Sequence, residues 1–273
     1  MTKEILQDIL ARLARGQLGE SEALAEALQR LGGQAASDAL QGLCLDTGRV
    51  LRTGLGEVVF AQGTSRAALL AAVEGLAAHG PVLVSRVSPG QGKALQEAFG
   101  QGNSHEEYQG HYWPEARLFA LGTPEGFRQK CLPPWPQQGE VLVVSAGAAD
   151  MPVALEAYGA LCFWGVDCGF IGDVGIAGLH RLAAHIPALR SARVIIAVAG
   201  MEGALPGVLA GLTPAPVLAV PTSVGYGIGT GGVAALSTML CTCVPGVAVL
   251  NIDNGFGAAA FAAKLTLGRP ERR

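Results

Sequence analysis

Five short apolar runs recur at regular intervals in the second half of the sequence, and they constrain the fold more than any other feature. Each run is rich in Val or Ile and ends in Gly or polar residues: EVLVVSAG, FIGDVG, ARVIIAVAG, APVLAVPTSVG and PGVAVLNIDNG. Segments with helical spacing separate or follow them, near 150–161, 176–189, 203–212, 231–242 and 255–265. Continuous apolar strands that alternate with helices are typical of a parallel sheet covered on both faces. We therefore expect an α/β domain from about residue 139 onward.

The first part of the chain is less regular. Apolar residues at helical spacing in 3–15 and 21–31, with a break at Gly16–Gly19, predict a helical lead-in. Between Glu57 and Gly122 the short runs VVF, PVLVSRV and ARLFALG alternate with helical patterns, which predicts a small α/β unit. The polar segment 103–113 has no clear period and predicts a surface loop, and the proline-rich CLPPWPQQG predicts a linker. The expected organisation is a helical lead-in at 1–45, a small α/β domain with linker at 46–138, and a catalytic domain at 139–273.

Composition excludes several classes of protein. Half of the 273 residues are hydrophobic, 15% are charged, and the formal net charge is −3 with a pI near 6.0. Such a balance argues against a surface for nucleic acid or for anionic membranes. The charged, amphipathic N-terminus is not a signal peptide, and Gly, Pro or polar residues interrupt every apolar run before it could span a membrane. The six cysteines contain no CxxC pair and are expected to be reduced thiols in a cytoplasmic protein.

Polar residues follow the predicted strands of the second half, at the points where ligands bind in parallel sheets. They are Ser145, Asp150, Asp173, Glu202, Ser223 and Asp253. Some have ordinary structural explanations, since Asp150 precedes a helical pattern as a helix N-cap would and Asp253 is typical of a turn. His180 and Arg181 also suit the edge of a helix, but they come soon after Asp173, which favours a functional cluster.

Two further patterns bear on chemistry. The glycine stretch SVGYGIGTGG at 223–232 matches neither a dinucleotide-binding fingerprint nor a P-loop, but its backbone amides suit a phosphate or carboxylate. Cys241 and Cys243 are expected near a helix end, where side chains two positions apart point about 200° from each other. At most one of the two thiols should then face a given cleft. No spacing of His, Cys and Asp indicates a zinc site, and no metal ligands are assigned.

Taken together, several stretches resemble the LarB family, the pyridinium-3,5-biscarboxylic acid mononucleotide synthases of nickel-pincer cofactor biosynthesis. They are SAGAADMPVALEA, GDVGIAGLHRL, AGMEGALPGVLAGL, PVLAVPTSVGYG and CVPGVAVLNIDNGFGAA, in order over about residues 140–260. Residues 45–65 resemble the family more loosely, and the family usually has Gly-Lys-Thr where this chain has Gly63-Thr64-Ser65. The same half is distantly similar to the PurE-type aminoimidazole ribonucleotide carboxylases and mutases. The resemblance thus implies a flavodoxin-like (PurE-like) three-layer parallel-sheet domain, preceded by a smaller helical and α/β region.

The family reaction, as the resemblance implies it, carboxylates nicotinic acid adenine dinucleotide at C5 of the pyridinium ring. Carbon dioxide or bicarbonate supplies the carboxyl group, and hydrolysis of the phosphoanhydride releases AMP. The Cys-x-Pro-Gly motif of the family falls on Cys243, which would form a cysteinyl-pyridine adduct. Glu202 and Asp173 would be the catalytic acids, with either one as the C5 base. Substrate would be bound by the residues that surround them in the motifs, Ser145, Asp150, His180, Arg181, Ser223 and Gly225.

The resemblance implies no covalently bound cofactor, and magnesium is expected only together with the diphosphate of the substrate. A homo-oligomer is expected because the helical segments 176–189 and 203–212 carry few charges for solvated faces. The resemblance to the PurE-type enzymes implies a tetramer or octamer. Two other functions stay open. A PurE-type carboxylase or mutase would use Asp173 and Glu202 but not Cys243, and a nucleotide-binding module would have no turnover.

Overall fold

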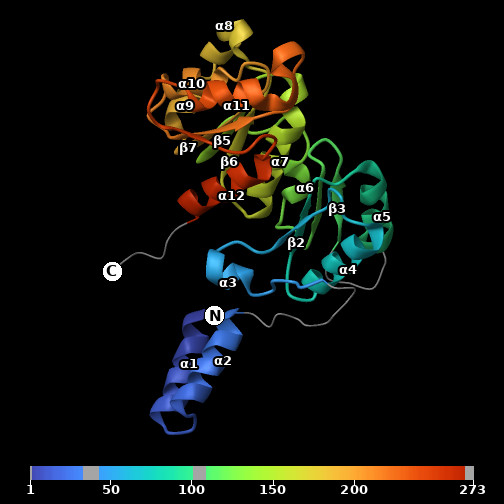
Figure 1. Cartoon of the computed structure of the whole chain (residues 1–273), viewed down its shortest axis with the longest axis vertical. Coiled ribbons are helices and arrows are strands. Elements are labelled where there is room, and N and C mark those ends of the chain that lie inside the picture. Colours follow the sequence, from blue (N-terminus) through green and yellow to red (C-terminus); the bar gives the residue numbers. More distant parts are fainter. Residues whose placement is uncertain (1, 33–42, 101–108, 268–273) are drawn as a thin grey trace. The chain divides into compact units, whose positions relative to one another are not determined.

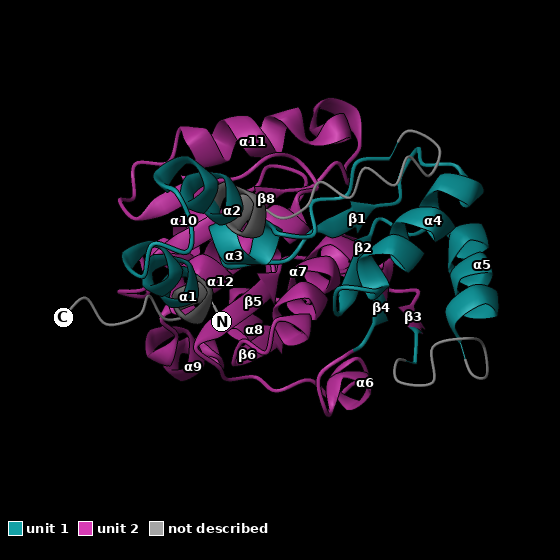
Figure 2. Cartoon of the chain, turned by 90° about the horizontal axis from the view of Figure 1, so that it is seen from below, with its two compact units in different colours: residues 1–110, 120–122 teal, residues 111–119, 123–273 magenta. Residues whose placement is uncertain are grey.

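The computed structural model describes residues 2–32, 43–100 and 109–267. The chain divides into two compact units, residues 1–110 with 120–122 and residues 111–119 with 123–273 (Figure 2). The expected domain boundaries near residues 45 and 138 stay a prediction. Within the described residues, no helix is both long and apolar enough to cross a membrane.

The first unit begins with the expected helices, α1 (Thr2–Ala14) and α2 (Glu20–Gly32). They form an antiparallel pair in which the Arg12 guanidinium lies 2.8 Å from the carboxylate of Glu26 (Figure 1). A short helix α3 (Arg49–Thr53) follows, and the Asp46 carboxylate bonds to Arg52 at 2.6 Å. That bond lowers the pKa of Asp46 below its ordinary value.

A small sheet of order β1-β2-β4-β3 comes next, with β1 (Val58–Phe60) parallel to β2 (Val82–Ser85). Helices α4 (Arg66–Ala77) and α5 (Pro89–Phe99) begin at the N-caps Ser65 and Ser88, whose side chains accept backbone hydrogen bonds. The remaining strands are β3 (His111–Trp113) and β4 (Leu118–Leu121). The predicted loop at 103–113 is therefore wrong at its end, where HYW forms β3, while 103–108 lie outside the described residues. A pattern three residues long is too short to reveal a strand by alternation.

The second sheet confirms the α/β prediction. Its strands are β5 (Val141–Ser145), β6 (Cys168–Ile171), β7 (Val194–Ala199), β8 (Val217–Pro221) and β9 (Val247–Val249). The order is β6-β5-β7-β8-β9 and every neighbouring pair is parallel. In chain order this is 2-1-3-4-5, the flavodoxin-like arrangement, whose ligand crevice lies between the first and third strands. Here those strands are β5 and β7, and both are fully buried.

Helices cover both faces of this sheet (Figure 1). On one face lie α7 (Met151–Phe163) and α12 (Gly255–Thr266), which pack against each other and against β7. The other face carries α8 (Leu179–Ala183), α9 (Ile186–Ser191), α10 (Leu205–Ala210) and α11 (Val233–Leu240). There Leu142, Ile195 and Leu209 belong to one buried cluster. The short helix α6 (Phe127–Lys130) precedes β5.

One buried carboxyl group joins the two helices of the first face. Glu156 of α7 is 2% exposed, and its Oε2 accepts a hydrogen bond of 3.1 Å from the backbone N–H of Phe256, at the start of α12. Gly255 is needed beside it, because a Cβ there would lie 2.1 Å from the carbonyl oxygen of Val153. The carboxylate thus satisfies an amide that the first turn of a helix leaves without an intrahelical partner.

We expect Glu156→Ala to lower the free energy of unfolding by about 2–3 kcal/mol, because it empties a buried position and leaves the partly buried N–H of Phe256 without this acceptor. Glu156→Gln keeps an acceptor oxygen and should cost less than about 1 kcal/mol. Urea denaturation followed by circular dichroism measures both. Equal losses for the two variants would contradict the capping role.

Candidate functional site at the carboxyl ends of the strands

The polar residues predicted from the sequence gather at one edge of the second sheet. Ser145 ends β5, Asp173 follows β6, and Glu202 follows β7. Ser223 and Asp253 follow β8 and β9 in the same way. Because all five strands are parallel, their carboxyl ends share one edge, and the expectation of a common edge is confirmed.

Glu202 is presented by a tight turn, residues 200–203, which we call the Glu202 turn. At Gly200 a Cβ would lie 2.4 Å from the Val224 carbonyl oxygen and 2.6 Å from Thr222 Oγ1. At Gly203, where φ is +65°, a Cβ would lie 2.8 Å from Cα of Ala235 in α11. Between the two glycines, Met201 has a φ of +53° and the Glu202 side chain is exposed. Left-handed backbone at a non-glycine residue persists only where the surroundings fix it, and such residues cluster at functional sites.

Asp150 is the buried acid of this edge, with 5% of its surface exposed. Its Oδ1 accepts a hydrogen bond of 2.6 Å from the Thr222 hydroxyl, and its Oδ2 accepts one of 3.0 Å from the Gly147 N–H. Burial raises the pKa of Asp150 above its ordinary value, although the bonds from Thr222, Gly147 and Gly200 favour the charged form. The predicted capping of the following helix needs correction. Asp150 stands at the N-cap of α7, but its side chain bonds backward to Gly147 and forward to Thr222.

Asp173 and Arg181 meet, as their spacing suggested. The Arg181 guanidinium lies 2.6 Å from Asp173 Oδ2, and both side chains are exposed. The backbone of Asp173 is left-handed, with a φ of +57°, and its N–H donates to the hydroxyl of the buried Ser145 at 3.2 Å. Ser145 therefore shapes the turn that carries Asp173. His180 is exposed beside Arg181 in α8.

The glycine stretch after β8 folds back on itself. The Ser223 N–H donates to Asp253 Oδ1 at 2.8 Å, and Asp253 has a φ of +55°. Gly225 is pressed against Gly229, whose carbonyl oxygen would lie 2.4 Å from a Cβ at Gly225. The amides of Gly229 and Gly231 bond to backbone carbonyls of the same segment. Part of the predicted run of anion-binding amides is thus used within the loop.

The two neighbouring cysteines are not on a helix, which corrects the geometry assumed from the sequence. Helix α11 ends at Leu240, Cys241 is its C-cap, and Cys243 lies in the connection to β9. Both are exposed. This connection leads to the amino end of β9, where the Gly246 carbonyl accepts from the N–H of Val217 at the amino end of β8. Within one chain, Cys243 therefore lies in a connection that returns to the edge opposite the one at which Glu202 and Asp173 stand.

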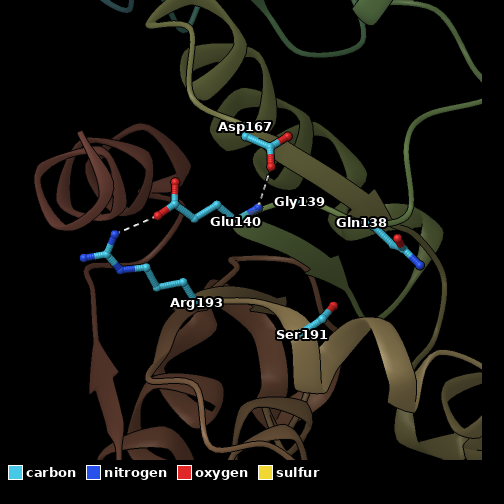
Figure 3. A pocket seen from close by; sticks show the side chains of 6 residues that line it. All are labelled: Gln138, Gly139, Glu140, Asp167, Ser191 and Arg193. Atoms are coloured by element: carbon cyan, nitrogen blue, oxygen red, sulfur yellow. Dashed lines mark hydrogen bonds and ion pairs between the residues drawn. The ribbon is translucent and has the colours of Figure 1, made fainter. Parts of the chain in front are cut away.

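A cavity of about 550 Å³ also opens at the amino ends of β5, β6 and β7 (Figure 3). Its lining residues are Gln138, Gly139, Glu140, Asp167, Ser191 and Arg193. The Glu140 carboxylate pairs with Arg193 at 2.7 Å, and the Glu140 N–H donates to Asp167 at 3.1 Å (Figure 3). We place the candidate site at the other edge, since Glu140 and Arg193 pair with each other here and since ligands of such folds bind at strand carboxyl ends. Among the described residues, no group of three His, Cys, Asp or Glu side chains is placed to hold a metal ion.

Sequence reasoning did not single out Thr222 or the two glycines of the Glu202 turn. Thr222 follows β8 directly, as Ser223 does, and it is fully buried. Its position after a strand was the available signal, but the prediction took the neighbouring Ser223 instead.

Comparison with known proteins identifies the family. Residues 140–271 match the family described as AIR carboxylase, and residues 37–122 match the LarB/PurE-like N-terminal domain. The chain belongs to the PurE-like AIR carboxylase family, with a LarB-type N-terminal domain. It is 33% identical to the N5-carboxyaminoimidazole ribonucleotide mutase of Methanocaldococcus jannaschii over 130 residues, which are 46% of this chain and 77% of that protein.

Two other proteins are similar to part of the chain. An uncharacterised protein of Methanocaldococcus jannaschii is 51% identical over 129 residues, or 45% of this chain. That match spans about half of the relative's own length, 48%. A crystal structure of a PurE2 variant from Treponema denticola is 21% identical, with a TM-score of 0.38, and covers 46% of this chain and 77% of that one.

The crowding around the Glu202 turn is testable with two left-handed glycines. Gly203→Ala should destabilise the fold by about 3 kcal/mol, because a Cβ would strain the backbone and meet Ala235. Gly231→Ala, at a φ of +79° with open space around it, should cost only about 1–2 kcal/mol. Thermal and urea denaturation compare the two. Equal losses of stability in the two variants would mean that the Glu202 turn can shift to accommodate the added Cβ.

Proposed function

We propose that the chain converts nicotinic acid adenine dinucleotide and carbon dioxide or bicarbonate into pyridinium-3,5-biscarboxylic acid mononucleotide and AMP. The observation that carries the proposal is the exposed carboxylate of Glu202, held in a crowded turn at the crevice edge of a carboxylase-family domain. The family membership and the LarB-type N-terminal domain support it.

The chemistry explains why this substrate needs a thiol. A pyridinium carbon at C5 is electron-poor and cannot attack carbon dioxide. When the thiolate of Cys243 adds elsewhere on the ring, aromaticity is lost and the resulting dienamine is nucleophilic at C5. C5 then bonds to carbon dioxide, a carboxylate removes the C5 proton, and the thiolate leaves with its electron pair as the ring becomes aromatic again. Water cleaves the phosphoanhydride and releases AMP.

We assign the proton transfer to Glu202 and the second carboxylate to Asp173. Glu202 is the exposed acid of its turn, whereas Asp173 already pairs with Arg181 at 2.6 Å. An anionic substrate group can exchange with Asp173 as the partner of Arg181, with His180 beside it, since both side chains of the pair are open to solvent. Any magnesium is expected together with the diphosphate of the substrate.

The position of Cys243 has a consequence for assembly. Since its connection returns to the amino end of β9, we infer that Cys243 of a second copy completes the crevice formed by Glu202 and Asp173. The composition of residues 203–252 supports contact with a second copy, because this segment contains no charged side chain. Within it, the apolar side chains of Ile228, Val233 and Leu240 are exposed. Such a surface suits contact with an identical copy.

A second candidate is a PurE-type carboxylase or mutase, which the mutase relative favours. An aminoimidazole ring is already electron-rich, so that reaction needs no thiol and would leave Cys243 unused. A nucleotide-binding module without turnover is the third. Incubating the protein with nicotinic acid adenine dinucleotide, bicarbonate and magnesium separates them. AMP with a dicarboxylated pyridinium supports our proposal, while turnover of aminoimidazole ribonucleotide alone, or binding without product, would contradict it.

We expect Glu202→Gln to lower kcat by about 100-fold or more, because the amide keeps the size of the side chain but cannot accept the C5 proton. The dissociation constant for the dinucleotide should stay within about three-fold of the wild type. Steady-state kinetics and calorimetry measure the two. If the Glu202→Gln protein kept its activity within a few-fold of the wild type, Glu202 would not be the proton acceptor.

Cys243→Ser should abolish carboxylation, since a serine hydroxyl is far less ionised and a poorer nucleophile. Cys241→Ser, the matched control, should keep its activity and lose about 1 kcal/mol of stability. If the thiol comes from a second copy, mixing inactive Glu202→Gln and Cys243→Ser proteins with subunit exchange should restore up to about a quarter of the activity. Light scattering should find an oligomer. A monomer, or no recovery in exchanged mixtures, would place the thiol within its own chain.

A further inference from the structure

Three connections of the crevice edge meet at Asp150. Its two carboxylate oxygens accept from Thr222 at the end of β8 and from Gly147 after β5. The amide of Gly200, after β7, adds a third bond. Asp150 and Thr222 are 5% and 0% exposed, so water does not compete for the bond between them. The loops after β5, β7 and β8 are therefore tied to one buried side chain.

This tie lies directly against the Glu202 turn. Gly200, the first residue of the turn, has its Cα hydrogens packed toward Thr222 Oγ1 and Asp150 Oδ1, which would lie 2.6 and 3.1 Å from an added Cβ. Backbone bonds continue the contact, for the Met201 N–H donates to the Val224 carbonyl at 3.0 Å and the Thr222 N–H donates to Ala199 at 3.1 Å. The left-handed Met201, which alone would cost about 1–2 kcal/mol, follows immediately.

We propose that Asp150 and Thr222 are positioning residues that hold the Glu202 turn in the conformation that presents its carboxylate to the crevice. This role differs from the substrate contact expected for Asp150, since both of its carboxylate oxygens already accept hydrogen bonds from the chain. The catalytic consequence rests on the proposed function. The structural consequence, that Asp150 and Thr222 hold the turn, is independent of the proposed function.

Thr222→Val tests the proposal, because valine keeps the shape of threonine but cannot donate to Asp150. Amide hydrogen exchange, read by mass spectrometry on peptides that cover 199–205, should be about 10-fold faster in this variant. Thr222→Ser restores the hydroxyl and should stay within about three-fold of the wild type. Thr213→Val is the matched control, since its hydroxyl bonds to the Leu189 carbonyl at 2.8 Å before β8, at the opposite edge, and should leave 199–205 unchanged.

Activity gives a second, separable readout. If the wild type turns over the dinucleotide, Thr222→Val should lower kcat by about 10-fold, leave KM within about two-fold, and be rescued by Thr222→Ser. If Thr222→Val does not fold, Asp150→Asn takes its place, since the amide cannot accept from all three donors. Unchanged exchange in 199–205 overturns the proposal whatever the activity. If Thr222→Val exchanges faster in 199–205 but the wild-type protein does not turn over the dinucleotide, the positioning role is supported and the proposed function is contradicted.

Discussion

The parallel hydrogen bonding of the five strands β5 to β9 is the constraint on which the rest of the second unit depends. Parallel pairing requires a crossover between successive strands, and each crossover here contains one or two α-helices that cover one face of the sheet. It also brings all five carboxyl ends to one edge, so residues more than 100 positions apart in sequence, Ser145 and Asp253, serve one crevice. Which groups the site contains is then decided by the loops that follow the strands at this edge.

Those loops hold the irregular backbone of the domain. Asp173, Met201 and Asp253, which follow β6, β7 and β9, all have left-handed backbones. Glycines at 200, 203 and 225 allow approaches that no Cβ would permit. Burial raises the pKa of Asp150, the acid under these loops, because the charged form is less stable there than in water. Such local costs are expected where a protein fixes groups for chemistry rather than for stability.

The sequence predicted the sheet, the helices between its strands and the edge at which the polar residues gather, because these follow from apolar periodicity and parallel topology. The sequence also predicted that Asp173 lies near Arg181, because the two residues are only eight positions apart. It could not predict the partners of Asp150, because the bond to Thr222 joins residues 72 positions apart and depends on strand order. It placed Cys241 and Cys243 on a helix because apolar spacing continues past Leu240, whereas the helix ends there. Strand β3 was missed because three residues carry no period.

Covalent activation of the ring by Cys243 is the claim on which the proposed chemistry depends, because without it C5 has no nucleophilic character. The most direct test quenches the reaction with acid during turnover and measures the mass of the peptide that contains both thiols. We predict an added mass equal to that of the substrate or its carboxylated form, which fragmentation assigns to Cys243 and which is absent in Cys243→Ser. An adduct on Cys241, or full turnover by the Cys243→Ser protein, would contradict the covalent mechanism.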